Sequence, residues 1–377
     1  MGWKMIFAAD IVPTETNEQY FINGDVQHLF GDELLDYMAG VDFRCFNLEV
    51  PFTEKRVKVY YPGPHMIAKP ATMAGIQAIN PSLVTIGNNH VLDQGQAGAK
   101  STIQTLKKNQ IPFTGAGRNS EEARRPYFID NGQCKVGIYN CAEYECVAAT
   151  DDRYGANHYD PLVSFDDVKR AKEECDVLVV LYHGGKEFYR YPSPNLQRIC
   201  RKFADQGANL VICQHTHCVG CEEIYKDARI VYGQGNFLFD QNEDEFKKTG
   251  IFVECDIEGG KIVLVKYVPF VKKGECVRMA GEKEAADILE GMKTRSDEIV
   301  KPGFIKEEYD KLAERYYAGY VRKLAANHFW LRVMNKLTRG NYLKKYYDRK
   351  QALSVINILS TENHDELLKA GLRLRDK

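Results

Sequence analysis

The sequence predicts an α/β protein built around a buried, mixed sheet. Short apolar strands alternate with amphipathic helical stretches through the first two thirds of the chain, as in layered α/β folds. Later, the apolar runs 250–257 and 261–268 are separated by a glycine-containing turn at 258–260, which indicates an antiparallel hairpin. The sheet is therefore expected to combine parallel and antiparallel strands.

The individual elements follow from the spacing of apolar residues. Short apolar runs bounded by polar residues predict strands, and apolar residues with a helical period predict helices. Before the hairpin, strands are predicted at 83–86, 111–114, 177–181, 210–213 and 230–232, and helices at 97–108, 165–174 and 195–206. From about residue 280 strand signals become rare and helical ones dominate. We therefore expect a main domain over 1–275 and a helical extension over 276–377.

Composition narrows the function classes. Of the 377 residues 27% are charged and the net charge is −1, so no overall field favours nucleic acid. No apolar stretch approaches the roughly 20 residues that span a bilayer. Met1 leads straight into a predicted strand ending at Asp10, which leaves no room for a signal segment. The eleven cysteines show no pairing framework, and we expect mostly buried thiols in a cytoplasmic protein.

Two histidines, His215 and His217, directly follow the apolar strand 210–213. Neutral imidazole is the commonest protein ligand for a transition metal, so this pair predicts metal binding. Polar clusters also end other apolar runs, and in an open α/β sheet the strand ends form one rim where ligands bind. These further clusters are Asp10, Asn47-Leu48-Glu49, Gly87-Asn88-Asn89-His90 and His183-Gly184-Gly185.

The clusters contain the parts of a hydrolytic metal site. Two divalent ions roughly 3.5–4 Å apart can activate a water for attack on a phosphate ester or an amide. We expect His90 to act as general acid and Asp93 to orient it. Oxygen and imidazole ligands suit manganese, iron and zinc alike, and one or two such ions are expected. The expected ligands are Asp10 and His217 for one ion, Asn89, His183 and His215 for the other, and Glu49 as the bridge.

Other interpretations of these residues stay open. Asp10 could cap a turn, Glu49 could be a surface charge, and Asn89 could occupy a turn with positive φ. A zinc site could also be built from Cys213, His215, Cys218 and Cys221, although a ribbon-type site needs a second ligand pair that is not evident. The remaining histidines are expected to have no partners and no role, namely His28, His65, His158, His328 and His364.

The segment 318–350 is basic and aromatic. It contains nine Lys or Arg residues against one acid, Asp348, and aromatic residues lie between them. Such a helical segment can bind an anionic polymer, a membrane surface or another protein. It can equally pack on the main domain with its lysines in water.

The order of the motifs resembles the bacterial capsule-synthesis family of CapA type. That family is associated with poly-γ-glutamate capsule biosynthesis and is related to calcineurin-like metallophosphoesterases. The resemblance covers roughly residues 4–270 and leaves the helical extension outside. The motifs that carry it are Ala9-Asp10, Asn47-Leu48-Glu49, Asn88-Asn89-His90 with Asp93 and Gly95, His183-Gly184-Gly185-Lys186-Glu187, His215-Thr216-His217 and Gly235-Asn236-Phe237.

The resemblance implies a metallophosphatase-like four-layer α/β/β/α sandwich with mixed sheets. It adds Glu187, Glu222 or Glu223, and Asn236 to the candidate site residues. The chain departs from the broader phosphoesterase pattern at Val12, where a histidine ligand is usual, and this implies a weakened or unevenly occupied first metal site. It also has Glu49 in place of aspartate, and Gly184 in place of an aromatic residue, which is expected to open the pocket.

These observations together predict a metal-dependent hydrolase that acts on a phosphoester or amide bond of a cell-envelope or exopolymer precursor. The substrate pocket is expected to be lined partly by the segments 55–69 and 186–191. Its expected binding residues are Lys69, Lys186, Glu187 and Asn236. The alternative is a non-catalytic accessory protein that binds an anionic polymer or a synthase partner through its basic C-terminal helices.

Overall fold

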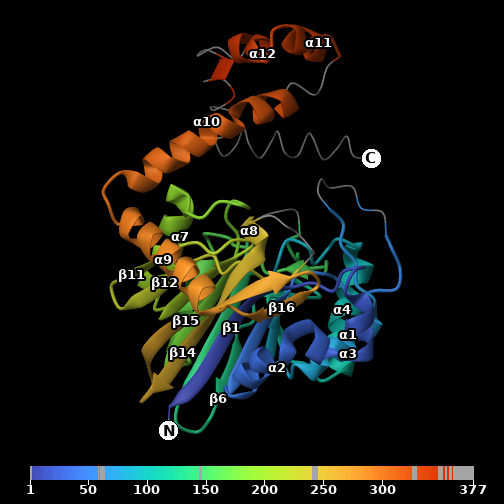
Figure 1. Cartoon of the computed structure of the whole chain (residues 1–377), viewed down its shortest axis with the longest axis vertical. Helices are drawn as coiled ribbons and strands as arrows, with labels where there is room; N and C mark the ends of the chain where they lie inside the picture. Colours follow the sequence, from blue (N-terminus) through green and yellow to red (C-terminus); the bar gives the residue numbers. More distant parts are fainter. Residues whose placement is uncertain are drawn as a thin grey trace. The chain divides into compact units, whose positions relative to one another are not determined.

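The computed structural model describes residues 2–57, 59, 64–143, 147–239, 245–324, 329–346, 351, 352, 355 and 359. The chain divides into two compact units, Met1–Ile305 and Lys306–Lys377 (Figure 1). The first unit contains the strands and the candidate site residues. Within the described ranges, no helix is both long and apolar enough to cross a bilayer.

The first sheet runs in the order β16-β15-β14-β1-β2-β3-β4, and β13 also pairs with β1. Strands β1 to β4 are mutually parallel. Strand β14 runs antiparallel to β1, β15 runs antiparallel to β14, and β16 runs antiparallel to β15. The predicted mixture of strand directions is therefore confirmed. The bounds are β1 Trp3–Ile11, β2 Phe43–Leu48, β3 Leu83–Thr85, β4 Phe113–Thr114, β13 Asn236–Leu238, β14 Thr249–Glu258, β15 Lys261–Lys273 and β16 Cys276–Met279.

The second sheet runs in the order β11-β12-β10-β9-β7-β6. Its four inner strands are parallel, and β11 and β6 are antiparallel edge strands. The short strands β5 (Ala116–Gly117) and β8 (Gly155–Ala156) form a separate antiparallel pair. The bounds in the second sheet are β6 Tyr127–Asp130, β7 Lys135–Ala142, β9 Val177–His183, β10 Leu210–Gln214, β11 Glu222–Tyr225 and β12 Ala228–Tyr232.

The first unit has nine α-helices among its described residues, and a tenth begins at its end. Several helix starts are capped: Asp25 accepts a hydrogen bond from the amide of His28 at 3.1 Å, and Ser193 caps α7 ahead of Pro194. The bounds are α1 Glu18–Asn23, α2 Val26–Ala39, the 3₁₀ helix Pro70–Thr72, α3 Met73–Ala78, α4 Gly95–Lys108, α5 Ser120–Ala123, α6 Ser164–Glu173, α7 Pro194–Asp205, α8 Glu245–Lys248, α9 Glu282–Ile299 and α10 Phe304–Leu324.

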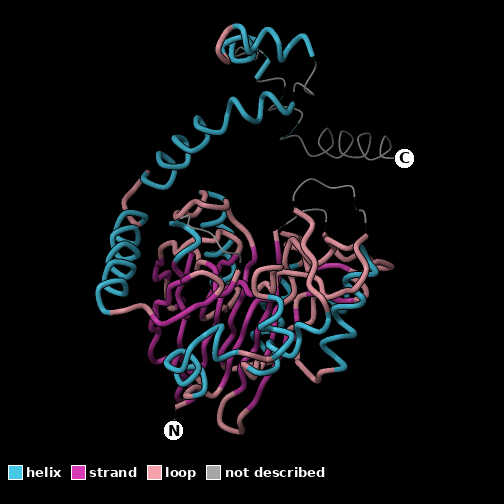
Figure 2. The backbone as a smooth tube through the Cα atoms, turned by 45° about the vertical axis from the view of Figure 1, so that its right-hand side comes forward, coloured by secondary structure: helices cyan, strands magenta, loops and turns pink. Residues whose placement is uncertain are grey.

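Three apolar cores separate four layers. Side chains alternate along β1, so that Met5 and Phe7 enter the core between the two sheets while Ile6 and Ala8 enter the core under α2, α3 and α4. Strand β9 is likewise buried on both faces, and its outer face packs on α6 and α7. Figure 2 shows the strands of the first unit grouped together with helices outside them. This arrangement confirms the expected α/β/β/α sandwich.

Most predicted elements are confirmed with small shifts in their ends, and the hairpin β14–β15 turns at Gly259 and Gly260. The second hairpin, β15–β16, was not predicted, because β16 is short and mixes apolar with charged residues. The first unit also extends past the expected boundary at residue 275, since α9 packs on β11 and β15. The second unit contains most of α10, together with α11 (Phe329–Leu337) and α12 (Asn341–Tyr346).

Candidate metal centre

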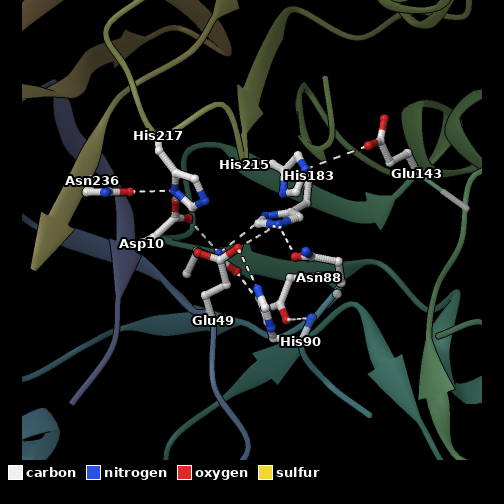
Figure 3. A network of polar contacts seen from close by, with 12 residues as sticks. Asp10, Glu49, Asn88, His90, Glu143, His183, His215, His217 and Asn236 are labelled. Carbon is white, nitrogen blue, oxygen red and sulfur yellow. Dashed lines mark hydrogen bonds and ion pairs between the residues drawn. The ribbon is translucent and has the colours of Figure 1, made fainter. Parts of the chain in front are cut away.

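The predicted metal ligands meet where the carboxyl ends of parallel strands of both sheets come together (Figure 3). Asp10 is in β1, Glu49 follows β2, and His183 ends β9. The two rims are joined by a hydrogen bond from the Gln214 side chain, at the end of β10, to the carbonyl of Ala8 in β1 at 3.1 Å. The pattern of polar residues after strands therefore predicted a real convergence in space.

Glu49 lies at the middle of the cluster. It shares one group of potential ligand atoms with Asp10 and His183, and a second group with His215 and His217. Within each group the ligand atoms lie within 4.8 Å of one another, and all five residues are buried. A carboxylate common to two ligand groups has the position expected of a bridge between two ions.

A third potential ligand faces the same point as Glu49 and His183. The Nε2 atom of His183 lies 3.0 Å from Oε1 of Glu49 and 2.9 Å from Oδ1 of Asn89. Two oxygens and one imidazole nitrogen thus converge from three different strand ends. This agrees with the expectation that Asn89 and His183 serve the same ion.

The buried carboxylates give a test of whether the residues suit a cation. Among the described residues, no hydrogen bond reaches either carboxylate oxygen of Glu49 or the Oδ2 atom of Asp10, and all three atoms are buried. Burial and repulsion from Asp10 raise the pKa of Glu49 to about 8. Burying a carboxylate without compensation costs several kcal/mol. A divalent ion would remove that cost, so the residues fit a metal centre.

The two histidines of the His-Thr-His run differ in protonation. Burial lowers the pKa of His215 well below its ordinary value, and the neighbouring His183 and His217 lower it further. For His217, burial is outweighed by the carboxylates of Glu49 and Asp10, which raise its pKa to about 9. His215 is therefore a neutral, ligand-competent imidazole, whereas His217 must release a proton to bind a metal.

The backbone at both histidines is strained. His215 has φ +82 and His217 has φ +55, in the left-handed region that residues with a side chain rarely adopt. Each such residue costs about 1–3 kcal/mol and persists only where the surroundings enforce it. Both rings lie beside Glu49 and come from alternate positions of one loop (Figure 3).

The ligand groups do not reproduce the expected division between two ions. The distances group His183 with Asp10, whereas the sequence analysis assigned His183 to the ion bound by His215. The expected pairing of Asp10 with His217 is also close in space, because Oδ2 of Asp10 lies 3.5 Å from Nδ1 of His217. Which ion each imidazole serves therefore stays a prediction.

Asn47 organises the ligands, a role that the sequence analysis did not assign. Its side-chain amide donates to Oδ1 of Asp10 at 2.8 Å and lies 3.4 Å from Nδ1 of His183. Its carbonyl oxygen accepts hydrogen bonds from Thr85 and Asn88, both at 3.2 Å. Such supporting contacts fix the direction of metal ligands.

His90 forms a pair with Asp93, as predicted. Its Nδ1 atom lies 2.7 Å from Oδ2 of Asp93, and its Nε2 atom lies 4.0 Å from Oε1 of Glu49. Asp93 is itself held by the amide of Met66, which donates to Oδ2 at 2.6 Å. Burial lowers the pKa of His90, but the hydrogen bond to Asp93 and the charge of Glu49 outweigh it, so the pKa is raised.

A pocket of about 680 Å³ opens beside His90 and His217. Of the four expected substrate-binding residues, Lys69 and Glu187 line it. Val12, which occupies the place of the missing histidine, also lines it, and so does His65, which was expected to have no role. The other lining residues include Glu15, Glu18, Glu54, Arg56, Phe188, Phe239 and Lys247.

The other two expected substrate-binding residues lie outside this lining. The side-chain oxygen of Asn236 lies 2.7 Å from Nδ1 of His217, so Asn236 positions a ligand. Lys186 does not line the pocket, although its charge helps to lower the pKa of His215. Lys69, within the pocket, forms an ion pair with Glu18 at 2.8 Å.

Glu143 was missed by the sequence analysis. It follows β7, and its Oε1 atom lies 3.8 Å from Nε2 of His215, while Oε2 accepts a hydrogen bond from the amide of Gly185 at 3.0 Å. An acid directly after an apolar strand was the available signal. A side chain at Gly184 would meet Tyr182 and Glu143 at 3.0 Å or less, so the glycine makes room for these two residues and does not open the pocket.

Glu222 and Glu223, which the resemblance added, lie in structural ion pairs on β11. Glu222 contacts Arg229, and Glu223 accepts two hydrogen bonds from Arg201 at 3.0 and 2.7 Å. The zinc alternative also lacks support. Among the described residues, neither Cys218 nor Cys221 belongs to a group of three potential ligands within 4.8 Å.

Residues 4–241 match a family model described as bacterial capsule synthesis protein PGA_cap. The capsule biosynthesis protein CapA of Bacillus anthracis is 26% identical over 242 residues, which are 62% of this chain and 59% of that protein. The PGA biosynthesis protein CapA of Bacillus subtilis strain 168 is 28% identical over 210 residues, which are 55% and 54% of the two chains. The chain thus spans little more than half the length of these relatives.

The chain is also similar, at low sequence identity, to solved structures. The crystal structure of a novel phosphatase from Mycoplasma pneumoniae has a TM-score of 0.45 at 12% identity and covers 73% of this chain and 95% of that one. The 5'-nucleotidase precursor from Thermus thermophilus has a TM-score of 0.39 at 11% identity and covers 78% and 59%. The family model itself covers more than half of the sequence, and the chain belongs to the bacterial capsule synthesis protein family.

Proposed function

We propose that this chain is a metal-dependent hydrolase that cleaves a phosphoester or amide bond in a cell-envelope or exopolymer precursor. The observation that carries the proposal is Glu49, a fully buried carboxylate that two ligand groups share beside a pocket. A buried carboxylate without hydrogen bonds from the described residues suits a bound cation. The names of the relatives supply the polymer context.

Six side chains would hold the metal. One or two divalent ions bound there would supply an activated water and positive charge to stabilise the charge that develops in the reaction. The mixed oxygen and imidazole set suits manganese, iron and zinc. The six ligands are Asp10, Glu49, Asn89, His183, His215 and His217.

The role of His90 in this proposal is to hold and deliver a proton. Its Nδ1–H donates to the carboxylate of Asp93, so the proton available to a substrate is the one on Nε2. His90 lines the pocket, and its raised pKa favours the protonated ring. Delivery to the leaving group would make cleavage of a poor leaving group possible.

The pocket would bind the substrate through groups of both signs. Arg56, Lys69 and Lys247 bring positive charge that suits a carboxylate or a phosphate. Glu187 and Glu54 bring negative charge that suits an amine or a second cation. Phe188 stands at the wall, with its ring centroid 5.8 Å from that of His217.

The test is turnover with defined metals. Protein purified without chelators would be assayed on phosphoester and γ-glutamyl amide substrates with manganese, iron(II) or zinc, together with His90→Gln and the control His158→Gln, a half-buried histidine that belongs neither to the pocket lining nor to a ligand group. We expect turnover with at least one metal, its loss in His90→Gln with metal content unchanged, and its retention in His158→Gln. Full metal occupancy without turnover on any substrate would contradict the proposal.

A second candidate function rests on the second unit. Residues 329–346 contain five Lys or Arg residues and no acid, and the side chains of Phe329, Trp330 and Leu337 are exposed. This combination favours an accessory role in which the segment binds an anionic polymer or a synthase partner. Retention on an anionic polymer would then fall steeply between about 0.05 and 0.5 M salt, whereas hydrolysis of a small substrate would change little. Retention that does not respond to salt would contradict it.

A further inference from the structure

A second cluster of potential metal ligands lies outside the metal centre. His28, Glu275 and Cys276 each offer one ligand atom, and these atoms lie within 4.8 Å of one another. The cluster contains a thiol, whereas the six ligands of the metal centre are oxygen and nitrogen donors only. A set of imidazole, carboxylate and thiolate is typical of zinc.

The fold brings these three residues together from distant parts of the chain. His28 lies in the first turn of α2, and its amide donates to Asp25. Glu275 lies in the two-residue turn between β15 and β16, which Gly274 permits with φ +62. Cys276 begins β16, the strand on which α2 packs. Helix α2 and the β15–β16 hairpin therefore hold the three residues in place.

The histidine ring is also held in a defined orientation. It stacks on Tyr20 with the ring centroids 3.8 Å apart and the planes at 9°. In this orientation Nε2 of His28 lies 3.4 Å from Oε1 of Glu275. The side chains of His28 and Glu275 are 37% and 30% exposed, so an ion and a water molecule can reach them from solvent. The expectation that His28 has no partner is wrong.

We propose that His28, Glu275 and Cys276 bind one zinc ion, with water at the fourth position of a tetrahedral site. The ion would tie the first turn of α2 to the β15–β16 hairpin. This site goes beyond the proposed hydrolytic function, because its ligands are separate from those of the metal centre.

Cobalt(II) is a probe that distinguishes the two metal sites. A thiolate bound to cobalt(II) gives a charge-transfer absorption in the near ultraviolet, and the metal centre contains no thiolate. The full chain would be stripped of metal, kept under a non-thiol reductant and titrated with cobalt(II). We expect the band to saturate with one equivalent, to disappear in Cys276→Ser, and to remain in Glu49→Ala, which removes the shared ligand of the metal centre.

Two further variants control for folding and specificity. Cys175→Ser replaces another partly buried cysteine and is expected to keep the band. His28→Gln preserves every cysteine. It is expected to weaken cobalt binding by at least about tenfold, because losing even a residue that only supports a ligand costs about that much affinity. The proposal is overturned if the parent protein saturated with cobalt(II) lacks the band, or if the band persists in Cys276→Ser. If Cys276→Ser does not fold, unchanged cobalt affinity in His28→Gln overturns it.

Discussion

Glu49 and Glu223 are both buried glutamates, 0% and 5% exposed, but their surroundings differ completely. Glu223 accepts two hydrogen bonds from Arg201 and one from the hydroxyl of Tyr232 at 2.6 Å. Glu49 receives no hydrogen bond from the described residues. The carboxylate of Glu223 is compensated by an arginine and by hydrogen bonds, whereas Glu49 has imidazoles beside it, those of His183 at 3.0 Å and His90 at 4.0 Å.

The contrast separates structural acids from functional ones better than burial alone. Both residues lie near strands of the sandwich core, and both were candidates for the site, Glu49 from its place after a strand and Glu223 from the resemblance. Only the pattern of partners distinguishes them, because a compensated carboxylate has no remaining capacity for a metal.

The largest effect on turnover is expected at His90, which lines the pocket and lies 4.0 Å from Glu49. His90→Gln removes the proton donor, and kcat is expected to fall by about 10²–10⁴-fold because general acid catalysis supplies a factor of that size. Metal content should not change, since His90 is not among the ligands. Steady-state kinetics with elemental analysis checks both points, and an unchanged kcat removes His90 from the mechanism.

The next effect concerns stability at Glu223. Glu223→Ala leaves the buried hydroxyl of Tyr232 without its acceptor, and the free energy of unfolding is expected to fall by about 1.5–3 kcal/mol. The cost is not larger because the side chain of Arg201 is 38% exposed and can turn to water. Urea unfolding measures the change. Loss of metal in this variant would contradict the structural role given to Glu223.

A pH dependence of metal binding should follow from Glu49 and His217. Their pKa values are raised to about 8 and about 9 in the metal-free protein, so both groups are protonated at pH 6 and must lose their protons to bind a metal. Metal affinity is therefore expected to rise with pH between 6 and 8, by about tenfold to a hundredfold per unit for one to two protons released. Calorimetric titration at several pH values tests this; affinity that is flat over this range would contradict it.

The smallest effect is expected at Asn236, which contacts the ligand His217. Asn236→Ala removes that support, and metal affinity is expected to fall by about 10–100-fold, as for other residues that orient a ligand. Asn209→Ala, which replaces an asparagine distant from the centre, provides the control. Competition with a coloured chelator measures both affinities, and equal values in the two variants would remove Asn236 from the centre.

The sequence predicted the site because parallel strands place their carboxyl ends on one rim. Six ligand candidates and the His90–Asp93 pair come together as that rule expects. The four-layer arrangement came from the resemblance, and the cores on the two faces of β1 and β9 confirm it. Local periodicity was sufficient for the seven elements predicted between 83 and 213, but it did not yield α5, β5, β6, β7 or β8, which lie in the same range.

The remaining features depend on contacts between distant segments. Glu143 approaches His215 only because β7 lies beside β9 in the second sheet. Lys69 lines the pocket, whereas Asn236 contacts His217. The periodicity of the sequence does not show which of these side chains faces the pocket. The cluster at His28 joins the first turn of α2 to a hairpin near residue 275, and β16 was not predicted at all.

The most direct test of the central claim is the metal content of the parent protein beside Glu49→Ala and Glu223→Ala, all purified without chelators. We predict that Glu49→Ala loses about two equivalents of a transition metal, since Glu49 is shared by both ligand groups. Glu223→Ala should retain the metal content of the parent. Equal metal content in the parent and Glu49→Ala would contradict the account.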